Sequence, residues 1–154
     1  MGHFARGVTL VELLVTLAVL AILLMIGIPS YQSITTSSRT SSEINELVTH
    51  LQFARAEAVK RGQNVTVNSN NGNNWANGWV VDDPNGNPLK QQAAFQGGDT
   101  LTATVGAIAY DRNGFTANAT TVTLHDSTNT LSYRKCLVVS AVGQLTLNTQ
   151  GACP

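Results

Sequence analysis

The feature that most constrains this chain is an apolar run near its N-terminus. Residues 8–28 form a stretch of 21 residues, and its aliphatic side chains are interrupted only by Thr9, Glu12, Thr16 and Gly27. A helix rises about 1.5 Å per residue, so this stretch reaches about 32 Å, close to the roughly 30 Å hydrocarbon core of a bilayer. The run therefore predicts a helix of membrane-spanning length.

Glu12 is the unusual residue of the run, because a carboxylate in a membrane helix is costly and marks a functional-site hypothesis. A secretory signal peptide is one alternative, but its apolar region is usually shorter and ends in a small-x-small cleavage site, which this run lacks. A plain membrane anchor is the other alternative. It accounts for the length of the run and leaves Glu12 unexplained.

The start of the chain, "RGVTLVELLVTLAVLAILLMIGIPSYQ", resembles the class III signal sequence of type IV pilins and type II secretion pseudopilins. The matching positions are Gly7 at the peptidase site, Val8 as the new N-terminus, Glu12 as its fifth residue and Pro29 as its twenty-second. Most family members begin with Phe, so Val8 is a variant. The resemblance implies cleavage between Gly7 and Val8 by prepilin peptidase, methylation of the Val8 amine and retention of the whole helix.

The resemblance also implies a role for Glu12, whose carboxylate compensates the N-terminal amine of a neighbouring subunit during assembly. Two unit charges about 4 Å apart attract by about 4 kcal/mol at an effective dielectric constant near 20. The amine exists only after the leader is removed, so cleavage after Gly7 permits the pairing.

Beyond Pro29 the helical pattern changes from apolar all round to amphipathic. One apolar stripe recurs at helical spacing and comprises Ile44, Leu47, Val48, Leu51, Ala54 and Ala58. We therefore expect one helix from Val8 to about Arg61, with a kink at Gly27 and Pro29 and a weak Ser/Thr-rich stretch after it. Thr40 and Glu43 fit a capping box if the helix restarts there.

The remainder of the chain predicts a β-rich head. Short segments rich in β-forming residues lie at 65–67, 78–81, 101–105, 107–110, 121–124, 131–140 and 144–147. Four Asn-Gly pairs, beginning at Asn71, Asn77, Asn85 and Asn113, are turn signals. Trp75 and Trp79 are expected in the core. The predicted class is α+β.

Four blocks of the head, "LQFARAEAVKRGQNVTV", "WANGWVV", "IAYDRNGFT" and "CLVVSAVGQL", resemble in order those of the GspH/FimT group of minor pseudopilins and FimU-like minor pilins. The resemblance implies the type IV pilin fold, a long N-terminal α-helix packed on a C-terminal antiparallel β-sheet head. It divides the chain into a leader (1–7), a transmembrane assembly helix (8–29) and a globular head (30–154), helical to about residue 61.

Little in the sequence supports an enzyme, a metal site or a cofactor. The histidines after the leader, His50 and His125, lack metal-ligand spacing, and we expect His50 to be solvated. The Asp83–Asn87 stretch begins like a calcium loop, but Pro88 replaces the glycine that such a loop needs, so a turn is expected.

The two cysteines, Cys136 and Cys153, lie late in a domain expected outside the cytoplasm, where a structural disulfide is favoured over free thiols. The bond would close a loop of about 18 residues and hold Leu145 and Leu147 against the sheet.

These features predict a minor pilin, a structural subunit of the complex that primes or caps a type IV pilus and supports motility, adhesion or DNA uptake. Its partners would be other minor and major pilins, prepilin peptidase and the inner-membrane assembly platform. The chain would begin as a single-pass inner-membrane protein with a periplasmic head and then enter the filament. The main alternative is an H-type minor pseudopilin of type II secretion.

A second alternative is a DNA-binding minor pilin of natural transformation. Such pilins carry a Gly-Arg-x-Arg element, and the stretch here, Gly143 to Thr146, lacks both arginines. Without Arg6 the chain has eight basic residues (9 − 1) against nine acidic ones, a net charge near −1. Nucleic acid is therefore an unlikely partner.

Overall fold

A computed structural model describes residues 8–149 and Cys153. The chain separates into two compact units that divide between Thr35 and Thr36. We refer to the second unit as the head. The expected leader and the cleavage position Gly7 lie outside the described residues.

The predicted long helix is present as α1, Leu10–Arg61, with Pro29 inside it. The helix continues through Thr40, so the capping box of Thr40 and Glu43, which depended on a restart there, does not form. The Thr40 hydroxyl donates instead to the carbonyls of Thr36 and Ser37, at 3.1 and 3.2 Å. Hydroxyl groups in the Ser/Thr-rich stretch thus bond back to the helix itself rather than capping a new one.

The predicted apolar stripe of α1 is buried in the head. The buried residues on α1 are Thr40, Ile44, Leu47, His50, Leu51, Ala54 and Ala58. Val48 is partly buried against the same core, and so is Phe53, with Lys90 Nζ 4.7 Å from its ring centroid. The burial of His50 contradicts the expectation that this side chain is solvated.

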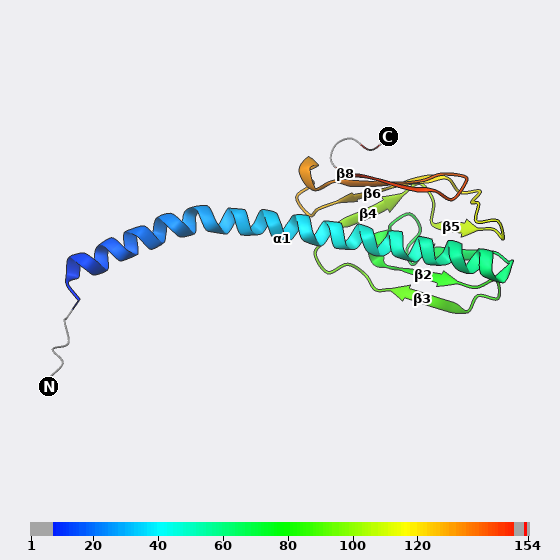
Figure 1. Cartoon of the computed structure of the whole chain (residues 1–154), viewed down its shortest axis with the longest axis horizontal. Helices are drawn as coiled ribbons and strands as arrows, with labels where there is room; N and C mark the ends of the chain where they lie inside the picture. Colours follow the sequence, from blue (N-terminus) through cyan, green and yellow to red (C-terminus); the bar gives the residue numbers. More distant parts are fainter. Residues whose placement is uncertain (1–7, 150–152, 154) are drawn as a thin grey trace, which may run out of the picture. The chain divides into compact units, whose positions relative to one another are not determined.

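Two four-stranded antiparallel sheets complete the head, and Figure 1 shows the head part of α1 running alongside their strands. The first sheet has the order β3-β2-β1-β5, with β1 Val65–Ser69, β2 Trp79–Asp82, β3 Pro88–Gln92 and β5 Ala107–Tyr110. The second has the order β4-β6-β7-β8, with β4 Thr100–Ala103, β6 Thr120–His125, β7 Lys135–Val139 and β8 Leu145–Thr149. Two short 3-10 helices are η1, Trp75–Asn77, and η2, Leu131–Tyr133.

Most predicted strands agree with the structure to within about two residues, and two departures have a physical explanation. β3 was not predicted, because it begins with Pro88, is otherwise largely polar and lies at a sheet edge, where one side needs no pairing. The predicted strand at 131–140 is divided into η2 and β7. The four Asn-Gly turns are confirmed by the positive φ angles of Gly72, Gly78, Gly86 and Gly114.

The core joins α1 to both sheets, with buried residues such as Leu47 from the helix, Val67 from the first sheet and Leu137 from the second. Trp75 and Trp79 are fully buried, as predicted, and their ring centroids are 6.3 Å apart. Both indole N–H groups are satisfied, since Trp75 donates to the Val105 carbonyl and Trp79 to His50. The fold is therefore α+β, as expected.

Candidate assembly segment and head surface

The first unit presents an apolar helical surface with nothing packed on it. The large aliphatic side chains between Val8 and Ile28 are all half or more exposed, and Met25 reaches 78%. Among the described residues this is the one helix long and apolar enough to cross a membrane. Such a surface needs lipid or other protein chains around it.

The first turn of α1 is capped by Thr9. The Glu12 N–H donates to Thr9 Oγ1 and the Leu13 N–H to the Thr9 carbonyl, both at 3.2 Å. Thr9 and Glu12 have the T-x-x-E spacing of a capping box, which is a local signal in the sequence for this cap. An acidic side chain in the first turn also interacts favourably with the helix dipole. Glu12 therefore has a local role in the first turn of α1, and an experiment on its role in assembly has to distinguish the two.

Glu12 is nevertheless the only charged residue in the sequence between Val8 and Arg39. The other polar group deep in the apolar run is satisfied internally, since the Thr16 hydroxyl donates to the Leu13 carbonyl at 2.8 Å. Glu12 is exposed. Any cation that neutralises its carboxylate in an apolar environment must therefore come from another molecule or from the chain's own terminus.

His50 locks the helix to the first sheet inside the head. Its Nδ1 accepts a 2.9 Å hydrogen bond from Trp79 Nε1, and its Nε2 lies 3.4 Å from Glu46 Oε1. Burial lowers the pKa of His50, an effect that Glu46 opposes and Lys90 reinforces. His50 lies three residues after Leu47, so the helical spacing of the stripe was a signal that could have predicted its burial.

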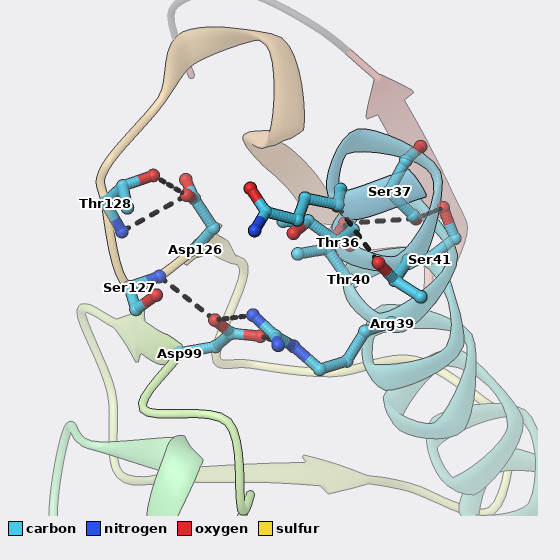
Figure 2. A network of polar contacts seen from close by, with 11 residues as sticks. Thr36, Ser37, Arg39, Thr40, Ser41, Asp99, Asp126, Ser127 and Thr128 are labelled. Atoms are coloured by element: carbon cyan, nitrogen blue, oxygen red, sulfur yellow. Dashed lines mark hydrogen bonds and ion pairs between the residues drawn. The ribbon is translucent and has the colours of Figure 1, made fainter. Parts of the chain in front are cut away.

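Arg39 joins α1 to the loop between β3 and β4 (Figure 2). Its Nε lies 2.7 Å from Asp99 Oδ2 and its Nη2 2.8 Å from Asp99 Oδ1, a two-pronged ion pair. The Ser127 N–H, from the loop after β6, donates to the same carboxylate at 3.0 Å. This network was not predicted, because residues 60 positions apart in polar segments carry no local signal of their contact in the sequence.

Arg55 joins α1 to the loop between β5 and β6 and to the loop between β7 and β8. Its Nε donates to the Gly114 carbonyl at 3.0 Å and its Nη2 to the Val142 carbonyl at 3.1 Å. Gly143 approaches Gly114 so closely that a Cβ at position 143 would collide with the Gly114 carbonyl. The stretch compared above with a DNA-binding element is thus a tight turn leading into β8.

Next to Arg55 the surface is hollowed and partly apolar. A groove of about 510 Å³ is lined by Gln52, Arg55, Ala56, Val59, Lys60 and Asn113. Val59, Phe115 and Val142, all at least half exposed, are brought to this end of the head by α1 and the two loops.

Comparison with known proteins assigns the head to a family. The GspH family, described as type II transport protein GspH, matches residues 43–143, more than half of the chain. This chain belongs to the GspH family. The prokaryotic N-terminal methylation motif matches residues 3–28, ahead of the GspH region. No curated protein matches the chain.

Solved structures place this GspH family member in the type IV pilin fold. Two crystal forms of the type IV minor pilin FimU from Pseudomonas aeruginosa align with TM-scores of 0.61 and 0.64, at 20% and 19% sequence identity. The alignments cover 76% and 80% of this chain and 96% of FimU. The predicted fold and the GspH/FimT resemblance are thereby confirmed.

The C-terminal end of the GspH head carries a disulfide. Cys136 of β7 is joined to Cys153, with 5.5 Å between their Cα atoms. β8 lies between the two cysteines in sequence and pairs with β7, Leu145 opposite Val139 and Leu147 opposite Leu137. Leu145 is partly buried against the core, as expected, but Leu147 is 37% exposed, because β8 is an edge strand and is largely exposed from Thr146 onward.

The stretch from Asp83 to Asn87 forms the expected turn, since the Asp83 carboxylate accepts from the N–H groups of Asn85 and Asn87, both at 2.9 Å. Within the described part of the chain no cluster of three or more His, Cys, Asp or Glu side chains suits a metal ion. The family and the fold are those of structural pilins rather than enzymes.

Proposed function

We propose that this GspH family member is a minor pilin, a structural subunit of the complex that primes or caps a type IV pilus. One observation carries the proposal: an exposed apolar helix with a single acid in its first turn leads into a GspH head with the fold of a type IV minor pilin. A structural subunit uses such a helix first to lie in a membrane and then to pack against other subunits. The expected segments are a leader (1–7), an assembly helix (8–29) and a head (30–154).

The proposal requires cleavage between Gly7 and Val8, with methylation of the new amine. The methylation motif supports it, since it spans residues 3–28 and includes both positions. Mass spectrometry of the filament-associated protein should find Val8 at the N-terminus, carrying one methyl group. An N-terminus beyond Ile28 would instead identify an ordinary signal peptide.

Glu12 would pair with the Val8 amine of a neighbouring subunit, and Gly27 and Pro29 would allow the helix to bend as it packs. Two variants separate this role of Glu12 from helix capping. Glu12→Gln removes the charge and leaves the Thr9 cap, whereas Thr9→Val removes the cap and leaves the charge. We expect Glu12→Gln to insert into the membrane normally and to be lost from the sheared-filament fraction. Thr9→Val should be incorporated like the parent.

If Thr9→Val fails to incorporate and Glu12→Gln is incorporated, helix capping rather than the charge is required, and if both are incorporated, neither role is needed. As a minor pilin, the chain would lie first in the inner membrane with its head in the periplasm, where prepilin peptidase and the assembly platform would be its partners. Other pilins would be its partners in the filament.

The alternative is an H-type minor pseudopilin of type II secretion, which the description of the matching family favours. The disulfide between Cys136 and Cys153 supports the pilus assignment instead, because a late cysteine pair resembles the pilus branch of the group. Deletion of the gene separates the two functions. Loss of surface pili with normal protein secretion is expected, and the reverse result would identify a pseudopilin.

A further inference from the structure

We propose that Arg39, Glu43 and Asp99 form a proton-dependent latch that fastens the first turns of α1 in the head to the loop between β3 and β4. The latch is closed when Glu43 carries a proton and loosened when Glu43 is ionised. It is independent of the pilus function, because it concerns contacts inside the head.

The Asp99 half of the latch is buried and fully bonded. Its side chain has no exposed surface, and its two oxygens accept two bonds from Arg39 and one from the Ser127 N–H. Arg39 has little freedom to move away, since Gly97 packs on it and a Cβ there would lie 2.7 Å from Arg39 Nε. The one guanidinium at this position is thus committed to Asp99.

Glu43 lies one helical turn after Arg39, on the same face of α1. It is half-buried, and its Oε2 is shielded from solvent without a hydrogen-bond partner among the described residues. When ionised, it is a second carboxylate beside Asp99 with one guanidinium between them. When protonated, it is a neutral group that can donate a hydrogen bond to Asp99, so burial favours the protonated form.

The charged groups around Glu43 agree with this geometry. Burial is the first cause that raises the pKa of Glu43 to about 7; the Asp99 carboxylate raises it further, by accepting a hydrogen bond from the protonated form and by repelling the ionised form, and Arg39 opposes these effects. Asp126, from the loop after β6, also acts on Arg39, but its carboxylate accepts from the Thr128 and Thr130 N–H groups. Arg39 is therefore already bonded to a carboxylate other than Glu43.

The sign of the pH effect follows from linkage. The pKa of Glu43 is higher in the folded head than its ordinary value of 4.5, so the folded state binds this proton more tightly. The stabilisation is present below about pH 4.5 and is lost as the pH rises through about 7. Raising the pH should therefore loosen the contact between α1 and the loop that carries Asp99.

The test uses the full chain in detergent, with head unfolding in denaturant followed by tryptophan fluorescence. Both tryptophans of the sequence, Trp75 and Trp79, are buried in the head, so the signal reports that unit. Glu43→Gln keeps a neutral donor in place of the protonated acid. At pH 5.5 the unfolding equilibrium constant of the parent should already exceed that of the variant, because Glu43 is largely ionised in the unfolded chain and still protonated in the folded head. The ratio of the two constants should rise by about a further tenfold between pH 5.5 and pH 8, less than the unscreened shift would give, because solvent screens a half-buried group.

The matched control is Glu57→Gln, the same substitution on an exposed part of the same helix, where the pKa of the carboxyl is lowered by hydrogen bonds from Arg61 and Lys60. Its difference from the parent should be equal at the two pH values. His50 is present in every protein compared, so its own titration cancels. A Glu43→Gln difference that is also independent of pH would overturn the latch.

A direct measurement keeps the proposal testable even if Glu43→Gln folds poorly. Carbon NMR of the labelled Glu43 carboxyl in the parent should show a titration midpoint near 7. Exchange of the Ser127 amide, corrected for the intrinsic effect of pH, should accelerate through the same range as the bond to Asp99 loosens. A midpoint near 4.5, or corrected exchange that does not change with pH, would show that no latch operates.

Discussion

The two parts of α1 are one continuous helix that meets two different environments. Up to Ile28 its aliphatic side chains point outward in every direction and are all exposed. From Ile44 to Ala58 apolar residues occupy one stripe, and that stripe is buried against two sheets. A helix that is apolar all round needs lipid or neighbouring chains, whereas an amphipathic helix is stabilised by its own domain.

The stability of the head should therefore respond differently to the same substitution in the two units. Removing an aliphatic side chain from the head leaves a cavity inside the chain's own core. Removing one from the first unit changes a surface that only a membrane or another subunit covers. This separation can be tested by unfolding the full chain in detergent, with tryptophan fluorescence as the signal.

The largest effect is expected from paired leucine truncations on α1. Leu47→Ala removes a fully buried side chain and should lower the free energy of unfolding of the head by about 2–5 kcal/mol. Leu20→Ala, at a half-exposed position of the first unit, should leave the denaturation midpoint unchanged. Equal destabilisation by both would show that the two units unfold together.

The disulfide is expected to affect the head alone. Cys153→Ser opens the loop closed by Cys136 and should cost about 3 kcal/mol in the chain-entropy picture. Membrane insertion of α1 should be unaffected, as judged by the membrane fraction. If the denaturation midpoints of Cys153→Ser and the parent are the same under non-reducing conditions, the disulfide contributes nothing to stability.

Arg55 should have a smaller effect through its two loop contacts. Arg55→Gln loses charge-assisted bonds to the Gly114 and Val142 carbonyls, and we expect a loss of about 1 kcal/mol. Arg112→Gln, at an exposed position of the same turn as Gly114, serves as the control and should change stability by less than about 0.5 kcal/mol. Equal effects of the two substitutions would remove the structural role of Arg55.

The smallest effect is the pH dependence contributed by His50. Because burial lowers the pKa of His50, the unfolded chain binds this proton more readily, and stability should fall as the pH drops below about 6.5. Protonation also removes the acceptor for Trp79. His50→Gln should be less sensitive than the parent between pH 7 and pH 5, and His125→Gln should behave as the parent. If the stability of the parent and that of His50→Gln depend on pH in the same way, His50 does not contribute to the pH dependence.

Local patterns in the sequence were sufficient to predict the two regimes of α1, the Asn-Gly turns and most of the strands. These features depend on side chains a few residues apart, so hydrophobic periodicity and turn chemistry report them directly. The acid at the start of the helix was also visible, and its T-x-x-E spacing from Thr9 is a local signal for the cap that the structure shows. The unpredicted strand β3 marks the limit, because a polar edge strand forms by pairing with a neighbour rather than by its own composition.

The tertiary structure alone decided which polar residues meet. Arg39 contacts Asp99, His50 contacts Trp79 and Arg55 contacts two loops, across separations of 29 to 87 residues. A charged or aromatic residue in a sequence does not specify a distant partner, because that partner is selected by how two sheets pack on one helix. The apolar helix and the β-rich head were therefore determined by the sequence pattern, and the polar contacts that fasten the helix to the head by the packing of the sheets.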